Sequence, residues 1–182
     1  MSLAQLAVRF GPGRLEPLAP DASLHTIITQ TIAALNFLAR EADMLGVDAA
    51  RMHLAGHSAG AHLAAMAATS ADAPPLRSAL LLSGLFDLAP LGLLPIGALL
   101  GLDKRATAEE LSPIRLRPPA NLHIGVAVGA QESDEFKWQS AAIATAWRAP
   151  APLALDDANH FSLLDGLNDG PLLALARATA AN

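Results

Sequence analysis

Short apolar stretches alternate with amphipathic helical repeats along most of this sequence. Between Leu24 and Leu38, apolar side chains recur three or four residues apart, which predicts a helix with Asp21 or Ser23 as its N-cap and Gly46 near its end. Similar patterns predict helices at about 59–68, 136–148, and 163 or 171 to 180. Mostly apolar runs predict strands at 6–10, 51–55, 79–85, 122–128 and 152–155, the first ending in the turn 11–13. Because apolar strands separated by helices are typical of a sheet covered on both faces, the pattern predicts a mostly parallel sheet in a three-layer α/β/α fold.

Residues 80–102 are apolar for long enough to suggest a membrane span. Asp87, Pro90, Pro95 and four glycines interrupt this stretch, and a bilayer-spanning helix tolerates such interruptions poorly. We therefore predict a buried strand, an apolar loop and a short helix here. A loop of this kind would suit a pocket for an acyl or aromatic group.

The pentapeptide Gly56-His57-Ser58-Ala59-Gly60 lies between a predicted strand and a predicted helix. A GxSxG sequence in this context predicts a nucleophile elbow, a turn so tight that the positions two residues on either side of the serine can carry almost no side chain. Gly56 and Gly60 meet that requirement, and Ser58 is the expected nucleophile. The free amides at the start of the helix would point toward a developing oxyanion, so the Ala59 amide is expected to form half of an oxyanion hole.

An acid and a histidine are expected in loops that follow later strands. In parallel sheets the reactive groups gather at the carboxyl ends of the strands. The loop after residues 122–128 supplies Glu132, Asp134 and Glu135, and the loop after residues 152–155 supplies His160. The order serine, acid, histidine is that of a serine hydrolase of this fold, in which His160 would accept the serine proton and the acid would orient the imidazole. Asp87, after an earlier strand, is a less favoured acid.

The remaining histidines predict neither a second base nor a metal site. His57 is expected to pack or hydrogen-bond beside the elbow, and His62 is expected to be a core histidine below it. The side chains of His53, His57 and His62 should diverge, and no typical zinc motif is present. We expect no metal and no cofactor. His57, Phe86 and Phe161 are candidates for the substrate pocket.

Composition and charge narrow the possible partners. The formal charge of −5 comes without a cluster of Lys or Arg, which argues against nucleic acid and anionic membranes as partners and favours a small-molecule substrate. The absence of cysteine excludes disulfides and thiol catalysis, and no secretion signal opens the sequence. We expect a cytoplasmic protein in which residues 1–182 form one domain.

Several motifs together resemble the arylformamidase (kynurenine formamidase-like) and esterase branch of the α/β-hydrolase superfamily. The matching segments are 18–20 (LAP), 46–48 (GVD), 54–63 (LAGHSAGAHL), 83–88 (SGLFDL), 112–113 (SP), 132–136 (ESDEF) and 159–161 (NHF). In this family the catalytic acid stands directly before the serine of an acid-Ser-x-Glu-Phe motif, which implies Glu132, with Asp134 as the alternative. The resemblance implies hydrolysis of aryl formamides such as N-formyl-kynurenine, or of small aryl or acyl esters.

One family motif is missing from the sequence. The family carries a His-Gly-Gly segment after an early strand, whose amides complete the oxyanion hole, and no such segment occurs here. We therefore expect an N-terminally truncated α/β-hydrolase fold that begins near the usual fourth strand. Its open sheet edge could be covered by a second copy of the chain, in agreement with an apolar content of 52%. A fragment, a shortened homologue that pairs with another chain, and a remnant of low activity that acts by association all remain open.

Overall fold

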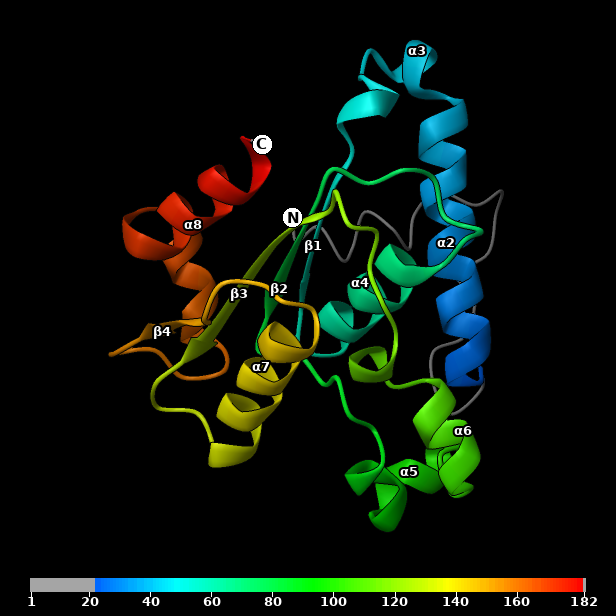
Figure 1. Cartoon of the computed structure of the whole chain (residues 1–182), viewed down its shortest axis with the longest axis vertical. Helices are drawn as coiled ribbons and strands as arrows, with labels where there is room; N and C mark the ends of the chain where they lie inside the picture. The colour runs from blue at the N-terminus through cyan, green and yellow to red at the C-terminus, as the bar shows by residue number, and fades with distance from the viewer. Residues whose placement is uncertain (1–21, 182) are drawn as a thin grey trace.

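The computed structural model describes residues 22–181. Its sheet is formed by β1 (His53–His57), β2 (Ser78–Leu82), β3 (His123–Gly129) and β4 (Leu153–Leu155). These four described strands are all parallel and stand in the order β1-β2-β3-β4 (Figure 1). Because the strands point the same way, the loops after β1, β2, β3 and β4 meet at one end of the sheet. The strand expected at 6–10 and the turn at 11–13 lie outside the described residues.

Helices cover both faces of the sheet, as the sequence pattern predicts. On one face, α4 (Ala59–Thr69) and α7 (Asp134–Ala146) pack on Leu81 and Val126 through a cluster that includes Ala65 and Ile143. On the other face, α8 (Gly170–Ala180) packs through Leu172 on Leu80, Leu82 and Ala127 (Figure 1). Alternate residues of β2 therefore serve opposite layers of the core, which explains why the whole strand is apolar and buried.

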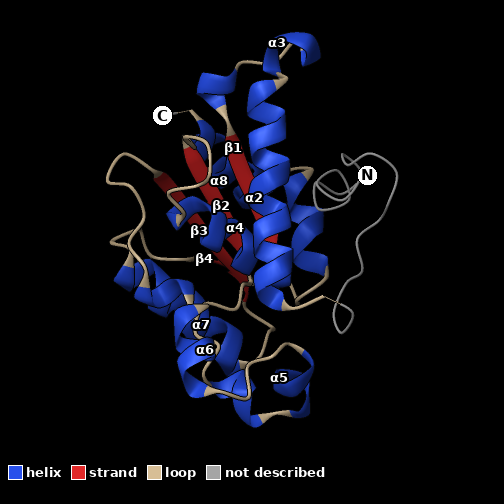
Figure 2. Cartoon of the chain, turned by 90° about the vertical axis from the view of Figure 1, so that its right-hand side faces the viewer, coloured by secondary structure: helices blue, strands red, loops and turns tan. Residues whose placement is uncertain are grey.

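A further layer lies outside α4. The helix α2 (Leu24–Arg40) begins at Ser23, whose hydroxyl accepts a hydrogen bond from the Thr26 amide, so Ser23 is the N-cap. Leu24 and Ile28 of α2 form a cluster with Leu88, Leu102 and Leu111. Through Ala108 and Leu100, this cluster joins α2 to α6 (Arg105–Glu110) and to the C-cap of α5 (Pro95–Leu99). Both α5 and α6 lie beyond the carboxyl ends of the strands (Figure 2).

The observed elements differ from the expected ones mainly at their ends. The strand expected at 51–55 begins at His53 because residues 49–51 form a 3₁₀ turn, in which the Asp48 carboxylate accepts the Ala50 amide. The long first helix ends at Arg40, and a separate helix, α3 (Ala42–Leu45), precedes Gly46, whose φ of 67° ends it. The 3₁₀ segments 90–93 and 113–115 were not expected. Of the two starts predicted for the last helix, 163 lies in a separate 3₁₀ segment, 162–167, and 171 lies at the start of α8.

The apolar stretch 80–102 is divided as predicted. It contributes the buried strand β2, a loop with the 3₁₀ turn 90–93, and the short helix α5. Within residues 22–181, no helix combines the length and the hydrophobicity that a bilayer crossing requires.

Candidate active site

Ser58 occupies the turn between β1 and α4 in a backbone conformation that residues other than glycine rarely adopt. Its φ is 56° and its ψ is −124°, whereas non-glycine residues seldom have positive φ. The Ser58 amide donates a hydrogen bond of 2.9 Å to the Leu82 carbonyl at the end of β2, so the neighbouring strand holds this turn in place. Strain retained at one serine is typical of a functional position. The Ala59 amide is in the first turn of α4, where amides have no partner within the helix.

The two glycines of the pentapeptide have different roles. A Cβ at Gly56 would lie 2.1 Å from the Gly60 carbonyl oxygen, so a side chain at position 56 is excluded by the backbone of the helix. A Cβ at Gly60 would have no heavy atom within 4 Å. The expectation that both positions need glycine was therefore wrong for Gly60. The Gly60 backbone packs closely against Gly56, but a side chain at position 60 would point into open space.

Alanine substitutions at these glycines should have opposite effects. We expect Gly56→Ala to destabilise the fold by about 3 kcal/mol or more, because backbone atoms cannot move aside cheaply. Gly60→Ala should be neutral or stabilising by up to about 1 kcal/mol, because alanine favours the helix. Urea unfolding of the two variants beside the wild type measures both effects. Equal stability of the two variants would contradict this account of the turn.

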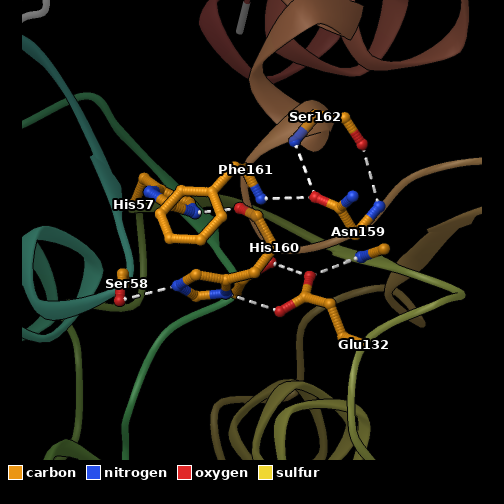
Figure 3. A network of polar contacts seen from close by, with 9 residues as sticks. His57, Ser58, Glu132, Asn159, His160, Phe161 and Ser162 are labelled. Atoms are coloured by element: carbon orange, nitrogen blue, oxygen red, sulfur yellow. Dashed lines mark hydrogen bonds and ion pairs between the residues drawn. The ribbon is translucent and has the colours of Figure 1, made fainter.

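A continuous path of hydrogen bonds joins Ser58, His160 and Glu132 (Figure 3). The Ser58 Oγ lies 3.0 Å from His160 Nε2, and His160 Nδ1 lies 2.6 Å from Glu132 Oε2. Because an ionised carboxylate can only accept, Nδ1 carries the imidazole proton in the neutral ring, which leaves Nε2 free to accept the serine proton. The three side chains come from the ends of β1, β3 and β4, three loops that the parallel sheet brings together.

Glu132 is buried, with 6% of its surface exposed, and both carboxylate oxygens have partners. Besides His160, it accepts hydrogen bonds from the Ser83 hydroxyl at 2.5 Å and from the Gly129 amide at 2.8 Å, both at Oε1. Burial raises the pKa of the Glu132 carboxyl, but the hydrogen bonds from Ser83, Gly129 and His160 outweigh burial, and the net pKa lies below the usual value. The carboxyl is therefore ionised at neutral pH.

Ser83 was not expected at this site. It follows β2, is completely buried, and has a φ of 46° that turns its hydroxyl toward the loop after β3. The Ser83 amide also donates to the Ala127 carbonyl of β3 at 2.9 Å. The sequence analysis placed Ser83 inside a predicted strand, at 79–85, and the structure ends that strand at Leu82. Nothing local in the sequence connects it with Glu132.

Replacing Ser83 with alanine should make the fold more sensitive to acid. A carboxyl with a depressed pKa stabilises the fold above its pKa in the unfolded chain, and this stability is lost as the pH falls through the folded-state pKa. Without the Ser83 hydroxyl, the Glu132 pKa should rise. Ser83→Ala should then lose about 1.5–3 kcal/mol at neutral pH and reach its acid-unfolding midpoint at a higher pH than the wild type.

Ser112→Ala is the matched control, measured by urea unfolding across the same pH range. Ser112 is also completely buried, and within residues 22–181 its hydroxyl bonds to two backbone groups, the Leu88 amide and the Ala108 carbonyl. Its substitution should lower stability by a similar amount at every pH, whereas the loss in Ser83→Ala should shrink as the pH falls and Glu132 becomes protonated in both proteins. A loss of stability in Ser83→Ala that stays the same across the pH range would refute the electrostatic role of Ser83.

Aromatic rings surround His160 on several sides. His57 Nε2 lies 2.7 Å from the His160 carbonyl oxygen and must donate to it, and the two imidazole rings are 4.6 Å apart. Burial lowers the pKa of His57, although the hydrogen bond to the His160 carbonyl opposes this shift. The rings of Phe136 and Phe161 lie 4.5 Å and 5.4 Å from the His160 ring, and Phe161 is 78% exposed. Phe136 was not among the expected site residues.

The other predicted residues lie away from the reacting atoms. The Asp134 carboxylate is fully exposed at the start of α7 and pairs with Lys137 at 3.4 Å, so the structure brings Glu132, and not Asp134, to His160. Asp87 accepts the Ala89 amide and orders the loop after β2. Phe86 is completely buried in the core beside α4, so its assignment to the substrate pocket was wrong.

Two polar residues near the site have local roles. His62 is buried below the turn, where its Nε2 contacts the Leu111 carbonyl at 2.8 Å and burial lowers its pKa, as expected for a core histidine. Asn159 accepts the amides of Phe161 and Ser162 and so shapes the turn that carries His160 (Figure 3). In the described part of the chain, no group of three or more His, Cys, Asp or Glu side chains is arranged to hold a metal ion.

Comparison with known proteins agrees with this fold. The family model described as BD-FAE matches residues 17–81. The sequence is 33% identical over 134 residues to kynurenine formamidase of Salmo salar and 32% identical over 132 residues to that of Danio rerio, in both cases covering 65% of this chain and 45% of the relative.

Solved structures extend the likeness to most of the chain. A proposed thioesterase from Silicibacter sp. TM1040 superposes with a TM-score of 0.78 at 26% identity, covering 88% of this chain and 61% of that one. Carboxyl esterase 2 of Tuber melanosporum gives a TM-score of 0.67 at 20% identity over 91% of this chain and 61% of its own, which bears on the fold alone.

The parallel sheet and these structural neighbours define the class as an α/β-hydrolase. Within that class, the chain is similar to proteins of the arylformamidase and esterase type. It spans about 45% of the length of the curated relatives that it matches.

Proposed function

We propose that the protein hydrolyses a small aryl formamide or an aryl or acyl ester through an acyl-Ser58 intermediate. The observation that carries this proposal is the hydrogen-bond path from Ser58 through His160 to a buried, ionised Glu132. An isolated serine hydroxyl is a weak nucleophile, and an adjacent base oriented by a third group is the usual means of activating it. The kynurenine formamidases among its relatives support the formamide substrate class.

The reaction would proceed in two halves. Ser58 Oγ attacks the substrate carbonyl as His160 Nε2 accepts its proton, and the imidazolium then gives that proton to the leaving amine or alcohol as the carbon–heteroatom bond breaks. Water, deprotonated by His160, attacks the acyl-Ser58, and the proton returns to Ser58 as the acid is released. Glu132 stabilises the imidazolium and remains ionised throughout. The Ala59 amide would be one donor to the oxyanion.

The aromatic groups beside His160 favour a substrate with a flat apolar part. Phe161 is a large apolar side chain, mostly exposed, within 5.4 Å of the His160 ring. Exposed aromatic rings at a polar site commonly serve as contacts for ligands, because they offer apolar area with little conformational freedom to lose. An aryl group beside the scissile bond would pack here.

A fluorophosphonate probe tests the proposed nucleophile without a guess about the substrate. Intact-mass analysis should find one adduct on the wild type and none on Ser58→Ala. Initial rates on N-formyl-kynurenine and on phenyl acetate then separate a formamidase from a general esterase. Absence of an adduct from a folded sample would overturn the proposal.

One observation favours a second candidate function, association through the sheet edge. Among the described strands, β1 pairs with β2 alone, so no described strand lies along the other side of β1. Under this alternative, two copies pair along β1 and Ser58 does not react. Light scattering after size-exclusion chromatography distinguishes it, because it requires a dimer together with no fluorophosphonate adduct.

A further inference from the structure

A cavity of about 890 Å³ lies at the end of the sheet opposite to Ser58. It is lined by the start of β3, by the ends of α7 and α8, and by the segment 114–120. Because all four described strands run in parallel, this end carries their amino termini and the Ser58 end carries their carboxyl termini (Figure 1). The cavity is therefore separate from the proposed active site, and its volume falls in the usual range for small-molecule sites.

The lining of this cavity is positively charged in a chain whose formal charge is −5. It includes Arg115, Arg117, Arg148 and His123, and no Asp or Glu belongs to its described lining. Arg115 pairs with Glu109 at 3.5 Å, whereas Arg117 and Arg148 form no ion pair with any described residue. Two guanidinium groups are thus available, each able to bind a carboxylate or phosphate with paired hydrogen bonds.

Arg148 occupies a backbone position that favours glycine. It follows the C-cap of α7 with a φ of 56°, and the Ala149 amide donates to the Ala144 carbonyl at 2.9 Å, as in the motif that commonly ends helices with a left-handed residue. Arginine at this position costs backbone strain that glycine would avoid. An unfavourable residue retained at the rim of a cavity points to a use for its side chain.

The lining of the cavity also has an apolar part, which includes the buried Trp147. Trp147 is 6% exposed, and its indole Nε1 donates to the Pro113 carbonyl at 3.1 Å, which fixes the ring. Leu122, Ile124 and Leu175 complete this apolar part. Arginines at the rim and an apolar part of the lining match a ligand with one anionic group and one apolar group.

We propose that this cavity binds a small organic anion with an aromatic or aliphatic body, held by Arg117 and Arg148 and in contact with Trp147. The ligand is distinct from the substrate of Ser58, and the site functions whether or not Ser58 is reactive. Benzoate is the simplest probe with both features. Benzamide keeps the ring without the charge, and acetate keeps the charge without the ring.

Trp147 reports on this site directly. The chain has two tryptophans, and Trp138 is 49% exposed on α7, so a Trp138→Phe variant leaves Trp147 as the single fluorophore. Benzoate should change the Trp147 emission in a saturable way, and benzamide and acetate should each bind about tenfold more weakly. Arg117→Gln and Arg148→Gly in the same background should each weaken benzoate binding about tenfold. Lys104→Gln, a charge change on an exposed residue outside the cavity, should leave it unaltered.

Arg148→Gly separates binding from folding. Because glycine accepts a φ of 56° readily, this variant should melt no lower than the parent while losing benzoate affinity. Four results would each overturn the proposal: no saturable response to benzoate, benzamide binding as tightly as benzoate, acetate binding as tightly as benzoate, or unchanged benzoate affinity in both arginine variants.

Discussion

Ser58→Ala should abolish hydrolysis while leaving the fold intact. We expect turnover of N-formyl-kynurenine or phenyl acetate to fall by about 10⁴-fold or more, because without the hydroxyl no acyl-enzyme can form and His160 has no nucleophile to activate. The substitution removes one side-chain hydrogen bond, to His160, and keeps the amide bond from position 58 to the Leu82 carbonyl. Steady-state kinetics and the fluorophosphonate adduct give two independent measurements.

A serine at the other end of α4, the helix that follows Ser58, provides the control. Ser70 is the C-cap of α4, and its hydroxyl accepts only the exposed Asp72 amide. Ser70→Ala should retain turnover within about twofold, since it is remote from His160 and loses only one exposed hydrogen bond. If Ser58→Ala kept a substantial part of the activity in a homogeneous sample, hydrolysis would have to arise elsewhere in the protein.

Glu132→Gln should have the second largest effect, a loss of about 10²–10⁴ in turnover. The amide oxygen can still accept from Ser83 and Gly129, so the loop should keep its shape. The amide nitrogen, however, would donate to His160 Nδ1 and favour the tautomer in which Nε2 carries the proton. That ring can only donate toward Ser58, and the imidazolium formed in the transition state would also lose its counter-charge.

Asp134→Asn is the matched control for the loss of one carboxylate from the same loop. Because Asp134 is exposed and its one ion pair among the described residues is with Lys137 at 3.4 Å, its substitution should change turnover by less than about twofold. The reverse order, with Asp134→Asn the more damaging variant, would assign the acid to Asp134. The pH dependence of turnover should change in Glu132→Gln and stay as in the wild type in Asp134→Asn, because, of the two carboxylates, only Glu132 contacts His160.

Local patterns were sufficient for the main elements of the fold and for the position of the reactive loops. Apolar strands and amphipathic helices predicted the layers, since burial on two faces leaves a continuous apolar run in a strand and a stripe in a helix. Because Ser58, the acid and His160 each follow a predicted parallel strand, the sequence predicted that they lie at one end of the sheet. The choice between Glu132 and Asp134 rested on resemblance and spacing, because the two carboxylates are only two positions apart in the sequence.

Contacts between segments far apart in the sequence could not be predicted. Ser83 contacts Glu132 across 49 positions, and a serine at a strand end has no local pattern that names its partner. Phe86 illustrates the opposite error. Its neighbours suggested a loop near a pocket, but Gln139 of α7 accepts the Phe86 amide at 2.8 Å and ties this segment to the core. Tertiary packing, rather than the apolar character of the segment, decides which way that ring points.

The positive φ angles of Ser58 and Ser83 have a consequence for local unfolding around the site. The Ser58 amide bonds to the last residue of β2, and the Ser83 amide bonds to β3, so each serine continues the hydrogen-bond ladder beyond its strand. Their amides should therefore exchange with solvent through the same rare openings as the centre of the sheet, and more slowly than those of the surrounding loops. The loops around the site are then free to diverge in sequence and shape without loosening the serine that they surround.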